Sequence, residues 1–106
     1  MIQQEMVIPD ALQAAGNVYH LIMENERVRV MRVAFSPGQK APMHHHPDHS
    51  AYVIKGGKIT ITPPSGKADT LVLEQGTAVF MNAQNHEAMN VGNTDIELIV
   101  TELKGP

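Results

Sequence analysis

Histidines in two separate parts of the chain are the residues whose type and spacing could do chemistry. His44, His45 and His46 are consecutive, and His86 lies far along the sequence. If the first three lie on a strand, His44 and His46 share one face, with Cα atoms roughly 6.6 Å apart, and His45 points to the other face. Two imidazoles that lean together from such positions can bind one metal ion. His45 should instead face solvent or a subunit contact.

Two further positions can complete this cluster. Pro47 should end the strand, so that His49 falls in a turn from which its imidazole can fold back toward the same point. His86 follows the turn-rich stretch 82–85 and starts another strand, as a ligand for an ion inside a barrel should. The alternative is a solvated run of histidines that binds nothing. The pattern favours one divalent transition metal ion, and without cysteine the candidates are Fe, Mn, Ni, Cu, Co and Zn.

Short β-patterned runs must position these side chains. They are rich in Val, Ile, Thr, Tyr and Phe, and turns that contain Gly, Pro or Asn separate them. The predicted strands are Val18–Met23, Arg27–Phe35, Ala41–His46, Ala51–Lys55, Lys58–Thr62, Thr70–Leu73, Ala78–Met81, Glu87–Val91 and Ile96–Leu103. So many short strands with almost no helix indicate an all-β fold, an antiparallel sandwich or barrel.

Only Pro9–Ala15 has a helical pattern, in which Asp10 could cap the start and Gly16 could end the helix. This helix is too short to form a core. We expect residues 1–16 to form an N-terminal arm that packs on the barrel or on a partner subunit.

Length and composition exclude several classes of protein. The 106 residues suit a single domain, residues 1–106, with an ordinary globular balance of 42% hydrophobic and 18% charged residues. The net charge of -3 and the scattered Lys and Arg argue against nucleic-acid and membrane partners. No apolar run is long enough for a transmembrane helix, and residues 1–5 lack the pattern of a signal peptide. We therefore expect a cytoplasmic protein.

The first histidine segment resembles the first motif of the small single-domain cupins. That motif has a glycine, two alternating histidines, a glutamate and a closing glycine, and Gly38, His44, His46 and Gly56 match it. Counting back from Gly56 puts His49 where the family has its glutamate, so we favour His49 as a fourth ligand in place of the carboxylate. If Gly57 closes the motif instead, Ser50 takes that position and the site has three histidines.

A second stretch resembles the other cupin motif. Gly76, His86 and Asn90 match its glycine, histidine and asparagine, whereas Asn82 and Gln84 stand where the family has proline and glycine. Both motifs in order imply a double-stranded β-helix, the jelly-roll barrel of the cupins, with His44, His46 and His86 among the metal ligands. The resemblance also implies a homodimer, because similar small cupins usually pair.

Two polar residues near the motifs are candidates for catalysis. Tyr52 could place its hydroxyl in the cavity, although a strand tyrosine is as often a core residue. Asn90 shares the face of His86 and could touch substrate, although such an asparagine more often satisfies a turn. The other side chains that we expect to line or support the barrel are Gln39, Met43, Phe80, Met81 and Met89.

Neutral imidazoles leave a bound ion its full positive charge, which favours an anionic, chelating small-molecule ligand. By resemblance we expect a metal-dependent enzyme of the dioxygenase type that acts on a small carbonyl compound or organic acid. The alternatives are a non-catalytic module that binds a metal or small ligand, and an isomerase or lyase that uses the ion as a Lewis acid. The fold alone does not decide among them.

Overall fold

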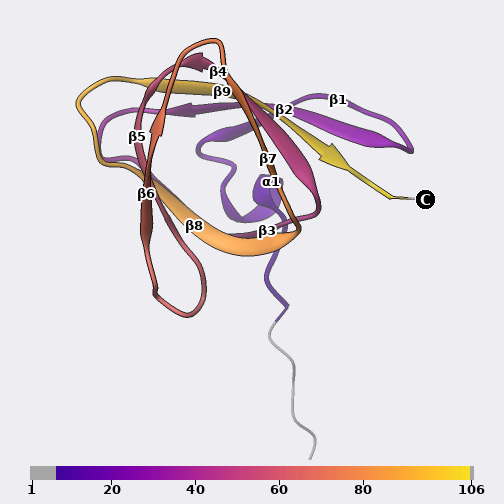
Figure 1. Cartoon of the computed structure of the whole chain (residues 1–106). Helices are drawn as coiled ribbons and strands as arrows, with labels where there is room; N and C mark the ends of the chain where they lie inside the picture. Colours follow the sequence, from indigo (N-terminus) through magenta and orange to yellow (C-terminus); the bar gives the residue numbers. More distant parts are fainter. Residues whose placement is uncertain (1–6, 106) are drawn as a thin grey trace, which may run out of the picture.

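The structure, a computed structural model, describes residues 7–105 and contains one short helix and nine strands in that range (Figure 1). The strands confirm the all-β prediction, and β7 and β9 have the predicted bounds. The elements are α1 (Ala11–Ala14), β1 (Tyr19–Glu24), β2 (Val28–Phe35), β3 (Lys40–His46), β4 (His49–Lys55), β5 (Gly57–Thr62), β6 (Asp69–Leu73), β7 (Ala78–Met81), β8 (Gln84–Asn90) and β9 (Ile96–Leu103).

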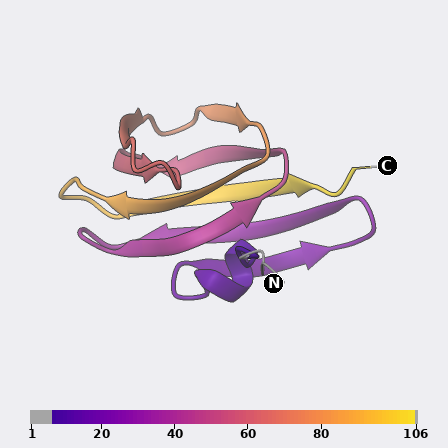
Figure 2. The same cartoon turned by 90° about the horizontal axis from the view of Figure 1, so that it is seen from below.

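The strands form two antiparallel sheets that close around a common interior (Figures 1 and 2). One sheet has five strands in the order β1-β2-β9-β4-β7, and the other has four in the order β3-β8-β5-β6. Every neighbouring pair in both sheets is antiparallel. This arrangement is the double-stranded β-helix that the two motifs imply.

Alternating side chains of the central strands build the core. In β9, Ile96, Leu98, Val100 and Glu102 point inward and are buried, while the residues between them are more exposed. Strand β2 pairs with β9 along its whole length and buries its own alternate residues against the same interior. Because the side-chain period of a strand is two, one apolar set faces the core and the other faces outward.

The described part of the N-terminal arm packs on the barrel. Asp10 caps α1 by accepting a hydrogen bond from the backbone N–H of Gln13 at 2.9 Å, as the sequence predicts. Ala11 and Ala15 are fully buried, and the N–H of His45 in β3 donates to the carbonyl of Pro9 at 2.8 Å. Residues 1–6 of the arm lie outside the described residues. Within residues 7–105 no helix is long and apolar enough to cross a membrane.

Two strand boundaries near the histidines differ from the prediction. His49 begins β4 rather than lying in the turn, because its backbone already pairs with Met81 in β7 and with Glu102 in β9. Strand β8 begins at Gln84, so that His86 lies inside the strand instead of at its start. Propensity alone misses both extensions, because pairing with neighbouring strands outweighs the polar sequence.

Candidate metal centre

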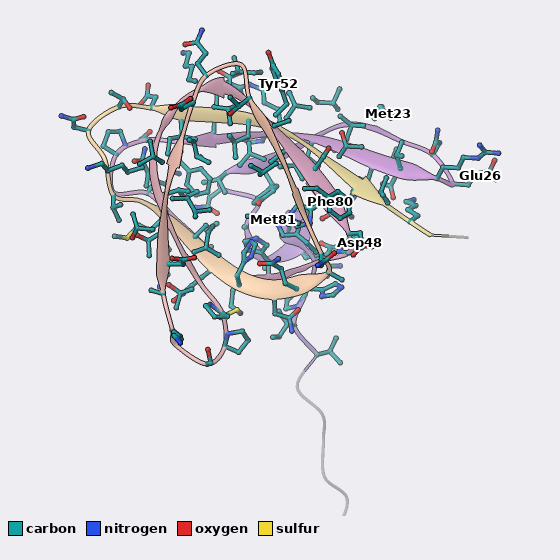
Figure 3. All side chains as sticks on the ribbon, in the orientation of Figure 1. Met23, Glu26, Asp48, Tyr52, Phe80 and Met81 are labelled. Atoms are coloured by element: carbon teal, nitrogen blue, oxygen red, sulfur yellow. The ribbon has the colours of Figure 1, made fainter. Side chains whose placement is uncertain are left out.

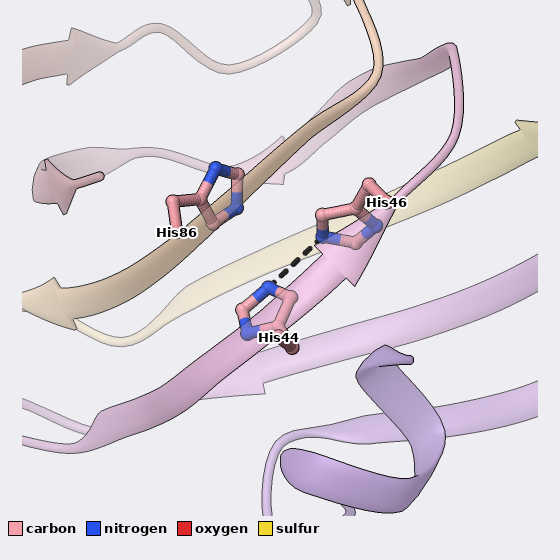
Figure 4. Close-up of side chains that lie close together, drawn as sticks. All are labelled: His44, His46 and His86. Atoms are coloured by element: carbon pink, nitrogen blue, oxygen red, sulfur yellow. Dashed lines mark hydrogen bonds between the residues drawn. The ribbon is translucent and has the colours of Figure 1, made fainter. Parts of the chain in front are cut away.

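Three histidines from adjacent strands converge inside the barrel (Figure 4). His44 and His46 lie on one face of β3, and His86 lies on β8 directly opposite His44 in the ladder. One ring nitrogen of each lies within 4.8 Å of those of the other two, and the three residues are at most 3% exposed. His45 between them is exposed, as strand alternation predicts. The sequence-predicted cluster is therefore assembled at these three residues and is positioned to bind a metal ion.

The hydrogen bonds of the rings determine which nitrogen is free. Nδ1 of His44 lies 2.6 Å from the carbonyl oxygen of Pro42, and Nδ1 of His86 lies 2.8 Å from Oε1 of Gln84. Both partners are acceptors, so each Nδ1 carries the proton and donates it. The Nε2 atom of each neutral ring then keeps a lone pair that can bind an ion.

A buried carboxylate orients His46 in the same way. Nδ1 of His46 donates to Oε2 of Glu102 at 2.6 Å, and the other carboxylate oxygen accepts from Arg29 Nη2 at 2.7 Å. Arg29 in turn contacts Asp10, the cap of α1, at 3.2 Å. Burial alone would raise the pKa of Glu102, but the hydrogen bonds from His46 and Arg29 outweigh it and lower the pKa. Glu102 therefore stays ionised beside the ligand, a common support for metal-bound histidine.

The free nitrogens form a donor set that fits a cation. Nε2 of His44 and Nε2 of His46 are 3.0 Å apart, the dashed contact in Figure 4. Two neutral rings that both donate from Nδ1 would set two lone pairs against each other at this distance. Two nitrogens that bind one ion at about 2.1 Å lie roughly 3.0–3.4 Å apart, so a shared cation satisfies both lone pairs.

His44 and His86 are held in the neutral form that a metal requires. Burial lowers the pKa of His44 to about 4, and burial with the neighbouring charges of His44 and His46 lowers that of His86 to about 3. An ion therefore has no proton to displace from these two rings at neutral pH.

A cavity of about 40 Å³ opens beside the cluster. His46, His49, His86 and Tyr19 line it together with apolar side chains from both sheets, including Phe35, Ile61, Leu73, Val79, Met81 and Val100. Each ordered water needs about 10–15 Å³ on this measure, so the cavity holds a few waters or a ligand of a few heavy atoms. No Asp, Glu, Lys or Arg of the described residues lines it.

A comparison with protein families decides the identity of this barrel. A Cupin domain family model matches residues 31–102, which is more than half of the chain. The chain belongs to the cupin family. The matched range begins in β2 and ends in β9, and it includes all four predicted ligand histidines of this cupin. A search of curated proteins finds no match.

Solved structures agree with the cupin fold. A cupin domain from Bordetella pertussis Tohama I is 24% identical, with a TM-score of 0.76, and the match covers 95% of this chain and 100% of that one. A Methanocaldococcus jannaschii cupin family protein with a double-stranded β-helix fold is 18% identical, with a TM-score of 0.66 and coverage of 95% and 92%. A Klebsiella pneumoniae protein with a double-stranded β-helix domain is 22% identical, with a TM-score of 0.66 and coverage of 83% and 72%.

His49 lies beside the three converging histidines but is not one of the set within 4.8 Å. Its ring stacks on that of His46 with centroids 4.3 Å apart, and its Nδ1 donates to the carbonyl of Pro47 at 2.8 Å. Its Nε2 is therefore free, and burial lowers its pKa. Its role as a fourth ligand of this cupin stays a prediction.

The two candidate catalytic residues lie away from the converging rings. Tyr52 is 49% exposed and lies on the outside of the barrel (Figure 3). Asn90 is buried, but its amide donates to the carbonyls of Phe35 and Thr94 and accepts from the N–H of Gly92. In this cupin Asn90 therefore satisfies backbone groups of nearby turns, and neither Tyr52 nor Asn90 hydrogen-bonds a histidine of the cluster.

The expected supporting residues divide between the two faces of the sheets. Met81 lines the cavity, as predicted, whereas Phe80 and Met89 are 60% and 38% exposed. Strand alternation explains the split, since Phe80 neighbours Met81 and must point the other way.

Sequence reasoning missed two residues of the site, Glu102 and Tyr19. Glu102 is the one acid on the inward face of β9, after Ile96, Leu98 and Val100, and an acid at an apolar position was an available signal. Tyr19 is buried in β1, and its hydroxyl lies 3.0 Å from Nε2 of His46. Burial and then the charge of Glu102 raise the pKa of Tyr19. No local pattern distinguished Tyr19 from a core tyrosine.

Proposed function

We propose that this cupin binds one divalent transition metal ion through His44, His46 and His86, with His49 as a fourth ligand. The observation that carries the proposal is the convergence of unprotonated Nε2 atoms, each with its Nδ1 engaged by an acceptor. Fe, Mn, Ni, Cu, Co and Zn all accept imidazole ligands, and the donor set does not choose among them.

We further propose that the bound ion takes a small carbonyl compound or organic acid in a reaction of the dioxygenase type. When bound, a redox-active ion would bring such a ligand and oxygen together. The chain itself orients the histidine rings through Glu102, Gln84 and the Pro42 carbonyl, and it supplies a small cavity with mostly apolar walls beside them.

A non-catalytic metal or small-ligand module is the second candidate. The small cavity supports it, because a substrate of more than a few heavy atoms would require the barrel to open. An isomerase or lyase would need an acid or base beside the ion, and the described lining offers only the ligand histidines and Tyr19.

Metal content of the untagged protein tests the site. His44→Ala and His86→Ala should each lose most of the bound metal, because a ligand disappears from a set of three or four. His45→Ala is the matched control, because His45 lies between His44 and His46 on the same strand but has an exposed side chain. Full metal content in His44→Ala and His86→Ala would overturn the site.

Two further measurements separate the remaining alternatives. Unchanged metal affinity in His49→Ala would remove His49 from the ligand set. Oxygen consumption by the iron- or manganese-loaded protein with small diketones or hydroxy acids would support the dioxygenase proposal, and ligand binding without turnover would favour the binding module.

We propose a homodimer that pairs through the outer face of the five-stranded sheet. Met23, Tyr52, Phe80 and Leu103 lie on strands of this sheet and are 43–60% exposed, which supports an apolar contact there. Sedimentation velocity tests the assembly, and a monomer at micromolar concentration would count against it. The cytoplasmic location stays a prediction from the sequence.

A further inference from the structure

The hydroxyl of Tyr19 makes a hydrogen bond that metal binding must break. Its oxygen lies 3.0 Å from Nε2 of His46, the nitrogen whose lone pair would bind the ion. Nδ1 of His46 already donates to Glu102, so Nε2 is the acceptor and the phenol is the donor. An imidazole nitrogen has one lone pair. Once Nε2 of His46 binds an ion, it can no longer accept the hydrogen bond from the phenol.

Nε2 of His46 is the one hydrogen-bond partner of the Tyr19 hydroxyl among the described residues. Tyr19 is 6% exposed, so bulk water does not readily replace that partner. A buried hydroxyl without an acceptor is unfavourable, so a metal-loaded site must offer a new acceptor within reach.

We expect the new acceptor to be an atom bound to the metal ion in the cavity. Tyr19 lines the same cavity as His46, His49 and His86, and its hydroxyl lies 3.0 Å from Nε2 of His46, so a ligand in this cavity would lie near both the phenol and the histidines. With Nε2–metal bonds of about 2.1 Å, the hydroxyl lies within roughly 5 Å of the ion, close enough to reach an atom bound to it.

We propose that Tyr19 donates a hydrogen bond to the metal-bound atom of a small anionic ligand and so selects ligands that present an acceptor there. The inference rests on the proposed metal centre and extends it by a specificity residue from β1. The class of ligand is a small anion with a compact apolar body, because the lining holds no cationic side chain to bind a second negative group.

Two other roles of Tyr19 predict different experimental results. The phenol could itself be a metal ligand as phenolate, which gives a visible charge-transfer band with Cu(II). It could instead serve only packing, since its ring meets that of His44 edge-on with centroids 5.3 Å apart. Tyr19→Phe separates these roles because it removes the hydroxyl and keeps the ring.

The test uses the full chain loaded with Cu(II), and azide as the probe anion. Competition with a chromophoric chelator gives the Cu(II) affinity, and the azide-to-copper absorption band gives the azide Kd. The two tyrosines of the chain provide a matched pair, since Tyr52→Phe also removes one hydroxyl and keeps the ring, but at a residue on the proposed homodimer face that does not line the cavity. We expect the azide Kd to rise about tenfold or more in Tyr19→Phe, with Cu(II) affinity unchanged or slightly higher, and both to be unchanged in Tyr52→Phe.

Any of four results would overturn the inference. An azide Kd in Tyr19→Phe within twofold of the original protein would show that the hydroxyl does not touch the anion. A phenolate-to-copper band that Tyr19→Phe abolishes, or a large loss of Cu(II) affinity, would make Tyr19 a ligand or a structural residue. No Cu(II) binding by the original protein would instead refute the metal centre itself.

Discussion

Substitution of Glu102 changes the support of His46 without removing a metal-binding nitrogen. Its Oε2 accepts from His46 Nδ1 at 2.6 Å, and its Oε1 accepts from Arg29 Nη2 and Nε at 2.7 and 3.0 Å. In Glu102→Gln the amide oxygen can still accept from His46, but its NH2 group faces the guanidinium and the negative charge is gone. In Glu102→Ala both donors lose their acceptor, and the ring of His46 is free to turn.

The size of the effect follows from these contacts. Loss of the partner of a ligand histidine typically weakens metal binding 10–100-fold. We expect about tenfold for Gln and about hundredfold for Ala, equal to about 1.4 and 2.7 kcal/mol. The metal-free protein should also lose about 2–4 kcal/mol of unfolding free energy, because a buried charge pair loses one partner. Arg29 is 14% exposed and keeps Asp10 at 3.2 Å, which moderates the loss.

Chelator competition measures the metal Kd, and urea unfolding in EDTA measures the stability of the metal-free protein. Glu97→Gln is the matched control, because Glu97 lies on the same strand and pairs with the exposed Arg32 at 3.0 Å. It should cost under about 1 kcal/mol and leave metal affinity unchanged. Metal affinities of Glu102→Ala and Glu97→Gln that agree within twofold would refute the proposed orientation of His46.

Three other perturbations have defined outcomes. Below about pH 6.5 the metal-free protein should lose unfolding free energy as pH falls toward 4, because burial lowers the pKa of His44 to about 4 and of His86 to about 3. At these two residues alone the unfolded chain then binds up to two more protons, a slope of up to about 2.7 kcal/mol per pH unit in urea unfolding, and a flat profile would contradict it. Metal at a hundredfold excess over its Kd should add about 2.7 kcal/mol, so calorimetry should show Tm falling on the order of 10 °C with EDTA. Asp10→Ala should cost about 1–2 kcal/mol in urea unfolding, because it removes the cap of α1 and a partner of Arg29, whereas Asp69→Ala on β6 should cost little.

The sequence predicted the part of the site that depends on local periodicity. His44 and His46 share a face because they are two residues apart on a strand, and this holds for any sheet that contains the strand. To place His86 in the site, the order of the two family motifs was also needed, because no local sequence pattern predicts that β8 lies beside β3.

The residues that were missed reach the site only through pairing across the barrel. Glu102 meets His46 from the other sheet, and Tyr19 comes from the edge strand β1. Their roles depend on how the two sheets face each other, which short-range patterns do not specify. The extension of β4 to include His49 has the same origin, because that residue pairs with Glu102 and Met81 on its two neighbouring strands.

The groups that accept hydrogen bonds from the four histidine rings differ in whether a substitution can remove them. His44 and His49 donate to the main-chain carbonyls of Pro42 and Pro47, each two residues earlier, and no side-chain replacement removes a carbonyl. His46 and His86 depend on the side chains of Glu102 and Gln84. A redesign that aims to shift the redox potential or metal preference of the centre therefore has two adjustable positions, 102 and 84, while the other two rings keep their tautomer through any such change.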